Sequence, residues 1–294
     1  MTFLKKLACA TAVAMSFAGA AGAAEVMTDW RFNPNGGGFA AAQEIQEYLD
    51  VNGQAFIQLT PTGERSFSFV EHAVFNIVQA DSDGRLFPLN YAGGNISALF
   101  EGFGNGTRGT GSTNGSFSFD GGTIRIFQNP TNGQYSTTAG IYGANLGREI
   151  ASFDVLAGGG GDVDASGSPV ANGQVSVFAR ADVGDLAPGY FFRGNGTDLS
   201  TESILSFAFT NANPTTANGL TPNLVSEVAC QYAGFTGAGC NGSAYANAPG
   251  QYFFVSNNGQ FKLAAEVPEP GSLALFGIAL LGAGFVSRKR AKKA

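Results

Sequence analysis

The segment Ser66–Val78, SFSFVEHAVFNIV, alternates apolar and polar side chains along most of its length. Successive side chains of a β-strand point to opposite sides, so this pattern predicts a strand with one buried face. Glu71 falls in the apolar row and His72 in the opposite, more polar row. The buried row is expected to hold these residues: Phe67, Phe69, Ala73, Phe75 and Ile77.

Similar short runs recur along the chain between Gly- and Asn-rich turns, and no strong helical pattern accompanies them. About a dozen short strands at such spacing predict an all-β fold, an antiparallel β-sandwich or jelly-roll-like domain. The further predicted strands are Ala55–Thr60, Asn95–Phe103, Ser116–Asp120, Thr123–Gln128, Tyr135–Tyr142, Glu149–Leu156, Gln174–Arg180, Tyr190–Arg193, Ser203–Thr210, Leu224–Ala229, Tyr252–Val255 and Gln260–Ala264.

Turn signals separate these strands. Asp83-Gly84 predicts the turn that ends the first strand, and Asn52-Gly53 predicts a tight hairpin into Ala55–Thr60. The stretch 40–49 fits either a helical face or a strand, and we favour the strand. The glycines Gly158–Gly161, together with Asp162–Pro169 after them, predict a long surface loop, which would be the boundary if the body had two lobes.

The charges of the chain are unevenly distributed. Residues 25–270 carry nine basic and all 22 acidic residues, a net charge of −13. Nucleic acid and anionic lipid repel such a surface, which excludes nucleic-acid binding, whereas divalent cations or a cationic polymer would be attracted. The 26 phenylalanines argue against disorder and for a packed β structure.

The chain begins with a pattern typical of secretory signal peptides. Lys5 and Lys6 precede an apolar run, Leu7–Ala20, and small residues follow it. We expect export by the Sec route and cleavage near Ala23 or Ala24, which divides the chain into a signal peptide (1–24), a β-sandwich-like extracellular domain (25–264) and a C-terminal segment (265–294). In the oxidising compartment outside the cytoplasm, Cys230 and Cys240 are expected to form a disulfide.

The C-terminal segment combines three features in a fixed order. The tripeptide Pro268-Glu269-Pro270 stays extended because its prolines disfavour helix. Residues 271–287 are uncharged and reach the lower length limit for a transmembrane helix. A basic tail, 288–294, begins with Arg288, Lys289 and Arg290 and would stay in the cytoplasm.

This order of motif, span and basic stop resembles the PEP-CTERM sorting signal of Gram-negative bacteria that secrete exopolysaccharide. The resemblance implies processing by the membrane peptidase exosortase, a transient anchor in the inner membrane, and then release or transfer to the cell surface. The resemblance indicates where the protein is delivered and gives no information about its activity. Phe253-Phe254-Val255 and Gly259-Gln260-Phe261 also resemble PEP-CTERM proteins linked to flocculation.

Candidate catalytic and metal sites are weak in this sequence. His72 is the only histidine, and Glu71 beside it points to the other strand face, so Glu71 is poorly placed to orient the imidazole. If Glu71 is buried in the apolar row, it needs a charged partner or a raised pKa. Asp162, Asp164 and Ser166 resemble the first half of a calcium loop, although Gly173 stands where a bidentate Glu belongs.

Three functional hypotheses remain. We favour a non-catalytic matrix protein without a cofactor that binds exopolysaccharide or another surface glycan through exposed aromatic and amide side chains, in a biofilm or floc. The alternatives are a secreted polysaccharide-modifying hydrolase that uses paired carboxylates and a calcium-dependent adhesion module.

Overall fold

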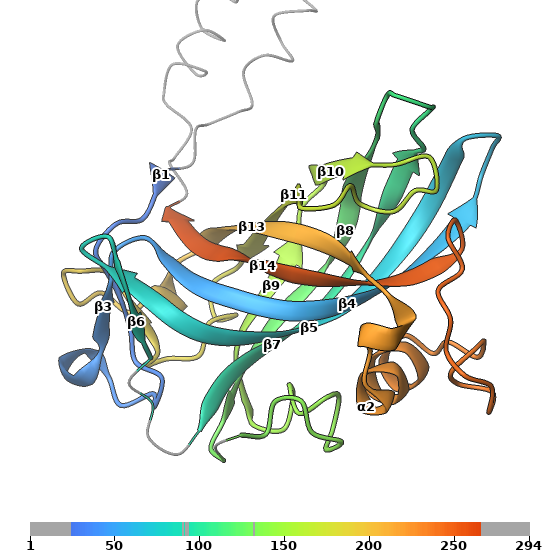
Figure 1. Ribbon diagram of the computed structural model, residues 1–294. Coiled ribbons are helices and arrows are strands. Elements are labelled where there is room, and N and C mark those ends of the chain that lie inside the picture. Colours follow the sequence, from blue (N-terminus) through green and yellow to red (C-terminus); the bar gives the residue numbers. More distant parts are fainter. Residues whose placement is uncertain (1–24, 90, 92–93, 132, 266–294) are drawn as a thin grey trace, which may run out of the picture. The chain divides into compact units, whose positions relative to one another are not determined.

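The computed structural model describes residues 25–89, 91, 94–131 and 133–265, and the body Val26–Ala264 forms one compact unit. It is mostly antiparallel β-sheet with a sandwich-like arrangement (Figure 1). The strands are β1 (Glu25–Val26), β2 (Trp30–Phe32), β3 (Gln43–Ile45), β4 (Tyr48–Pro61), β5 (Ser66–Ser82), β6 (Arg85–Pro88), β7 (Asn95–Thr107), β8 (Gly115–Asn129), β9 (Arg148–Val155), β10 (Gly158–Val163), β11 (Gly173–Ala181), β12 (Phe191–Phe192), β13 (Ile204–Thr215) and β14 (Tyr252–Ala265).

Helical segments are short in the described part of the chain. Three single 3₁₀ turns are η1 (Phe39–Ala41), η2 (Leu199–Thr201) and η3 (Ala217–Gly219). The α-helical turn α2 (Pro222–Leu224) continues directly into the π-helix η4 (Val225–Tyr232). Thr221 caps this helix, since its Oγ1 accepts a hydrogen bond of 3.2 Å from the Leu224 amide, and proline follows at the first position.

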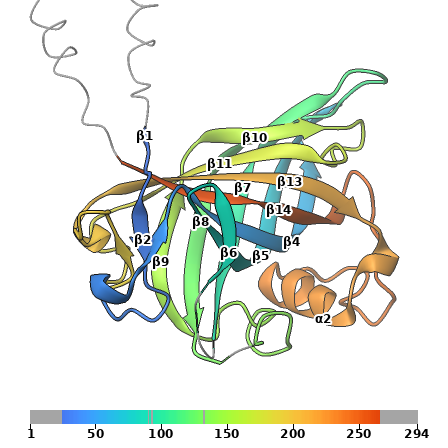
Figure 2. The same ribbon diagram turned by 60° about the vertical axis from the view of Figure 1, so that its left-hand side comes forward.

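The main sheet closes on itself. Its strands follow the order β14, β13, β11, β10, β8, β7, β5 and β4, and β14 pairs again with β4 from Tyr252↔Gln58 to Lys262↔Tyr48. Strand β9 bridges β8 and β11 beside β10. In Figure 2, β10, β11 and β13 lie above β4 and β5. The closure leaves neither β4 nor β14 as a free edge, which protects both strands from pairing with other chains.

The walls of the closed sheet pack against each other through apolar side chains. Phe153 of β9 meets Phe261 of β14 across the interior, with ring centroids 5.5 Å apart. Phe69 of β5 makes edge-on contacts with Phe117 and Phe119 of β8, both at 5.4 Å. The Phe row of the segment 66–78 therefore faces the interior, as its alternation predicts.

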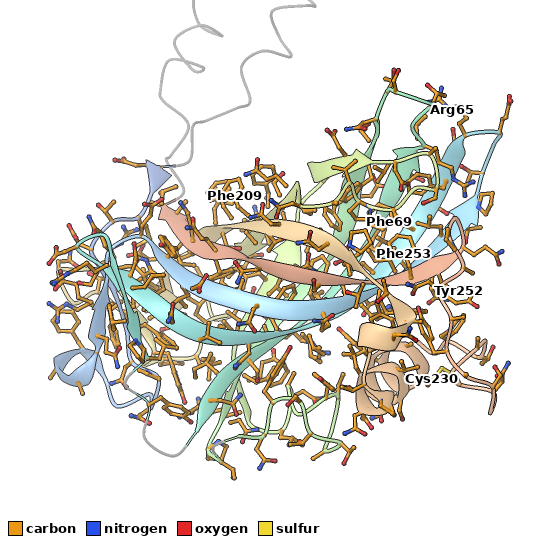
Figure 3. All side chains as sticks on the ribbon, in the orientation of Figure 1. Arg65, Phe69, Phe209, Cys230, Tyr252 and Phe253 are labelled. Atoms are coloured by element: carbon orange, nitrogen blue, oxygen red, sulfur yellow. A yellow bond between two sulfur atoms is a disulfide. The ribbon has the colours of Figure 1, made fainter. Side chains whose placement is uncertain are left out.

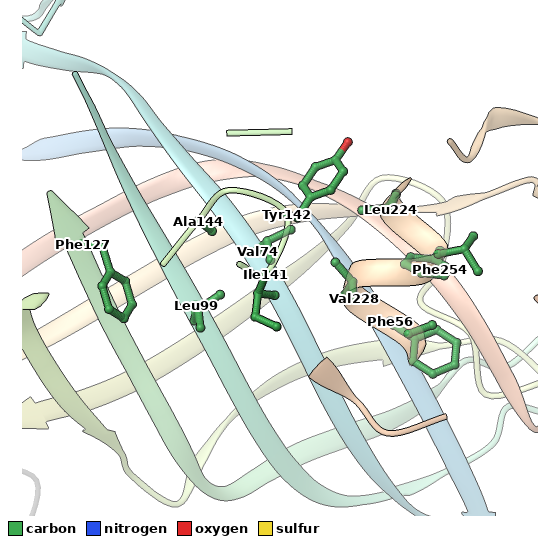
Figure 4. Packing of buried hydrophobic residues seen from close by; sticks show 12 residues of the cluster. Phe56, Val74, Leu99, Phe127, Ile141, Tyr142, Ala144, Leu224, Val228 and Phe254 are labelled. Atoms are coloured by element: carbon green, nitrogen blue, oxygen red, sulfur yellow. The ribbon is translucent and has the colours of Figure 1, made fainter. Parts of the chain in front are cut away.

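A second apolar cluster lies on the outer side of the sheet, beneath the helix (Figure 4). Leu224 and Val228 of the helical segment pack on Phe56 of β4 and Val74 of β5. The loop 141–144 covers the neighbouring part of the same surface. The closed sheet thus buries apolar side chains on its inner side and, under the helix, on its outer side as well.

Two strand predictions are wrong. Leu224–Ala229 is helical, because its apolar residues Leu224, Val225, Val228 and Ala229 form a helical stripe that packs on the sheet. Tyr135–Tyr142 consists of turns, since Ser136 and Tyr142 have positive φ angles of 69° and 51°, which interrupt an extended chain.

Two turn predictions also need correction. Asn52-Gly53 lies inside β4, and Gly53 is required there because a Cβ at this position would sit 2.2 Å from the Val74 carbonyl oxygen. Of the predicted loop 158–169, residues 158–163 form strand β10 and residues 164–169 form a loop as expected; within β10, a Cβ on Gly160 would sit 2.0 Å from the Phe117 oxygen. Both glycines permit close contact between strands. The Asp83-Gly84 turn is confirmed between β5 and β6.

The remaining strand predictions are confirmed in position, although only Phe191 and Phe192 of the predicted strand 190–193 are extended, and two pairs of the predicted strands merge into single longer strands. Ser116–Asp120 and Thr123–Gln128 are both parts of β8, and the last two predicted strands are both parts of β14. In the stretch 40–49, the strand alternative is confirmed from Gln43 to Ile45 (β3) and from Tyr48 onward (β4), whereas residues 40 and 41 belong to the 3₁₀ turn η1.

Candidate functional site

A polar depression of about 250 Å³ lies on the outer side of the closed sheet, over β4, β14, β13 and β11. We call this surface the amide face. Its lining consists of Asp50, Gln174, Phe209, Thr210, Asn211, Asn258, Gly259 and Gln260.

Strand alternation and register bring these side chains together. On β14, Val255 and Phe261 line the interior, so Asn258 and Gln260 point outward. Gln260 pairs with Asp50 across the β14–β4 ladder. On the other side of the depression, Gln174 of β11 pairs with Asn211 of β13. Four adjacent strands thus each contribute a carboxylate or amide side chain to one surface.

An aromatic and cationic rim borders the amide face. The Lys262 Nζ lies 5.6 Å from the ring centroid of Tyr48 and 5.9 Å from that of Phe209, within cation–π range. Lys262 also forms an ion pair with Glu47. Figure 3 labels Phe209 on β13, and the ring is half-buried. One ring therefore stays accessible beside the amides.

Burial and neighbouring charges shift the pKa values of Asp50 and Tyr48 at this surface. Burial raises the pKa of the Asp50 carboxyl. Burial also raises the pKa of Tyr48, and the negative charges of Asp81, Asp50 and Glu47 raise it further, while a side-chain hydrogen bond with Gln260 lowers it. The Tyr48 hydroxyl accordingly keeps its proton at neutral pH and is available for hydrogen bonding.

The amide face suits a ligand rich in hydroxyl groups. Each amide side chain offers both hydrogen-bond donors and acceptors, and Asp50 adds an acceptor. The half-buried ring of Phe209 offers apolar area for packing. Amides beside an aromatic ring can bind hydroxyl groups and pack against C–H surface at the same place.

The predicted separation of Glu71 and His72 is present. Glu71 lines the interior cavity, and His72 lies on the outer side against the helix. The His72 ring contacts Tyr232 edge-on with centroids 4.8 Å apart, and its Nε2 lies 3.9 Å from Glu101 Oε1. Burial lowers the pKa of His72, although the Glu101 charge opposes this shift.

Tyr232 lies beside charges at the end of the helix. Burial raises its pKa to about 12, Arg125 lowers it through its charge and a hydrogen bond, and Glu101 raises it. The surroundings of His72 are thus an aromatic ring and a half-exposed carboxylate.

The suggested calcium ligands are divided between a strand and a tight turn. Asp162 lies in β10, whereas Asp164 begins the loop that follows. Asp164 Oδ1 accepts hydrogen bonds from the Ser166 amide at 2.8 Å, the Ser166 hydroxyl at 2.7 Å and the Ser168 amide at 3.1 Å. One oxygen of this carboxylate is therefore already engaged in holding the turn.

The two cysteines of the body are bonded. Cys230 at the end of the helix and Cys240 form a disulfide with their Cα atoms 5.4 Å apart. Both pack at the margin of the outer apolar cluster, beside Phe235 and Tyr245. The bond ties the loop after the helix to this cluster.

The C-terminal sorting residues Pro268, Glu269, Pro270, Arg288, Lys289 and Arg290, like the predicted signal peptide, lie outside the described residues. Within the described ranges, no helix is long and apolar enough to cross a membrane.

Comparison with known families identifies the C-terminal segment. Residues 266–290 match the family model of the PEP-CTERM protein-sorting motif. The resemblance of the C-terminal segment to the PEP-CTERM sorting signal is confirmed, and the motif marks an exosortase-targeted extracellular protein with a sorting signal for the cell envelope. No curated protein and no solved structure matches the chain.

The amide face was not predicted from the sequence. Its residues come from segments far apart, such as Asp50 and Gln260, and only strand closure unites them. A signal was nevertheless present: polar Asp50, Asn52 and Gln54 alternate with apolar or small residues, as an outward strand face does. The prediction of a turn at Asn52-Gly53 obscured this alternating pattern.

Proposed function

We propose that the protein is a non-catalytic component of the extracellular matrix that binds exopolysaccharide on the amide face and contributes to biofilm or floc formation. The observation that carries the proposal is the depression over β4, β14, β13 and β11, where amides, a carboxylate and an aromatic ring converge. The sorting motif at residues 266–290 supports it, because a protein delivered outside the cell meets secreted glycans there.

The net charge of the protein limits which class of glycan it can bind. The region 25–270 has a net charge of −13, so a strongly anionic polymer would be repelled unless cations screen it. The amides carry no charge and require no counter-charge on the ligand. We therefore propose a neutral, hydroxyl-rich polysaccharide as the ligand.

Glu71 and Glu101, the carboxylates near the centre of the sheet, are badly placed for hydrolysis by a carboxylate pair. Glu71 faces the interior and Glu101 the outer side, so these two groups do not flank a common space. A paired-carboxylate mechanism needs both groups on one substrate, separated by roughly 5 to 10 Å. Incubation of the protein with the native exopolysaccharide should accordingly release no reducing ends.

Retention on immobilised native exopolysaccharide tests the binding. The wild-type protein should be retained, and the double variant Asn258→Ala/Gln260→Ala should bind at least tenfold more weakly. The matched control is Asn114→Ala/Gln251→Ala, which removes two exposed amides outside the depression and should bind normally. A wild type that passes through unretained, or equal losses in both double variants, would refute the proposal.

A further inference from the structure

In the part of the chain that the structure describes, one carboxyl group lines the interior of the closed sheet, in surroundings that are otherwise almost entirely apolar. Glu71 is 8% exposed and lines a cavity of about 80 Å³. Aromatic rings form much of the wall, among them Phe67, Phe69, Phe100 and Phe119. Figure 3 labels Phe69 and Phe253, which belong to this inner surface.

Glu71 has no polar neighbour on the adjacent strands. Its cross-strand partners are Ile57 on β4 and Gly102 on β7. Residue 102 must be glycine, because a Cβ there would lie 2.5 Å from the Phe100 ring. Among the described residues, no hydrogen bond or ion pair satisfies the Glu71 carboxyl, and burial alone raises its pKa to about 7.

Two other polar side chains of the described residues line the cavity, and they come from strands that do not pair with β5. Asn257 pairs with Gly53, whereas Glu71 pairs with Ile57, four residues further along β4. That separation along a strand is about 13 Å. Thr210, the remaining polar side chain of the lining, belongs to β13, which does not pair with β5. On its own strand and on the neighbouring strands β4 and β7, an occupant beside Glu71 therefore meets one polar side chain, Glu71 itself, and several rings.

These surroundings select the chemistry of an occupant. Water is held poorly, since a buried water needs two to four polar partners. An anion is repelled by the carboxyl, and a cation would lose its hydration for one counter-charge among apolar walls. A hydroxyl can both donate to and accept from a carboxyl, which satisfies both groups, and an aliphatic chain can pack on the phenylalanines.

We propose that the cavity binds a small aliphatic alcohol, with its hydroxyl hydrogen-bonded to Glu71 and its chain among the Phe rings. The volume fits a molecule of about three to four non-hydrogen atoms, since cavities of about 150 Å³ hold benzene, which has six. This site lies on the inner side of the sheet and is separate from the amide face, so either can exist without the other.

Titration with 1-propanol tests the site, in the exported form of the protein with labelled isoleucine methyl groups. Ile57, Ile124 and Ile126 line the cavity, and their NMR signals should shift saturably. Glu71→Leu should weaken binding at least tenfold. Glu149→Leu, a change at an exposed position of β9, should leave it unchanged. 1-Chloropropane, which has the chain without the hydroxyl, should bind the wild type at least tenfold more weakly.

The outcomes separate a ligand site from a packing defect. Absence of saturable shifts with 1-propanol overturns the proposal, as does equal binding of 1-chloropropane. If 1-propylamine bound more strongly than 1-propanol, Glu71 would be a cation-binding group, and this result would also overturn the proposal. If Glu71→Leu does not fold, the comparison of these three ligands on the wild type still decides the question.

Discussion

Glu71 and His72 are adjacent in the chain and occupy opposite sides of one sheet, the first facing the interior cavity and the second facing the helix. Both side chains are buried, at 8% and 9% exposure, and burial shifts their pKa values in opposite directions. Burial raises the pKa of the acid and lowers that of the base, so both groups favour their neutral forms.

The Glu71 carboxyl should make stability decrease as the pH rises. Its pKa is raised from 4.5 to about 7, so between these values the unfolded chain loses the proton while the folded protein keeps it. Unfolding is thereby favoured, by about 3 kcal/mol once the pH exceeds 7. Denaturant titrations from pH 4 to 8 should show this decrease in wild type.

The variant Glu71→Gln isolates this contribution, because its side chain does not titrate. The stability difference between wild type and variant should fall steadily from pH 4.5 to 7 and then level off. His72 contributes in the opposite direction in both proteins, since its lowered pKa makes stability rise with pH up to about 6.5, and therefore cancels in the difference. A difference that does not vary with pH would contradict the assignment.

Asp81 should be a strong contributor to stability. It is 3% exposed, and its Oδ1 accepts hydrogen bonds from the backbone amides of Glu47 at 2.9 Å and Tyr48 at 2.8 Å. Asp81→Ala leaves two amides without their charged acceptor, at a cost of roughly 3 kcal/mol. Chemical denaturation of the wild type and the variant measures this loss of stability. Glu64→Ala, at an exposed position in the β4–β5 turn, should change stability by less than about 0.5 kcal/mol.

The disulfide should stabilise the region of the helix. Cys230 and Cys240 are ten residues apart, and removing the cross-link of such a loop costs about 3 kcal/mol in the chain-entropy description. The double variant Cys230→Ala/Cys240→Ala should therefore melt several degrees lower than the wild type. Reduction of the wild type should lower its melting temperature similarly and leave the variant unaffected; a variant that melts like the oxidised wild type would rule this out.

Gly53 should tolerate no side chain. A Cβ at this position would lie 2.2 Å from the Val74 carbonyl oxygen and 2.5 Å from the Phe75 ring, so Gly53→Ala should destabilise by about 3 kcal/mol. Gly63→Ala is the matched control, because its nearest neighbour, Ser66, lies 3.6 Å away. Equal melting temperatures for the two variants would show that the strands adjust freely.

Strand alternation was sufficient to predict the class of the fold and the orientation of its clearest strand. The pattern of 66–78 placed the Phe row inside and His72 outside, because the two-residue period of a strand is a local property. Glu71 was likewise expected to need a partner or a raised pKa, and the raised pKa is what burial produces.

The errors arose where local signals have two physical causes. Glycine permits turns and also close strand contact, which is its role at Gly53 and Gly160. The helix after Thr221 had both a capping residue and a proline at its start, but its short apolar run also fitted a strand. Closure of the sheet by β4 and β14, which assembles the amide face, depends on pairing between distant segments and has no local signal.

The first and last parts of the body meet, since the Met27 amide donates a hydrogen bond of 2.8 Å to the Leu263 carbonyl oxygen. The path of the folded backbone is therefore nearly a ring. Joining these ends by a short linker and opening the chain at the exposed Asp83-Gly84 turn would give a circular permutant. In that permutant, only the short strands β1, β2 and β3 would lie between β14 and β4, and the pair of strands that closes the sheet would join segments close together in the sequence.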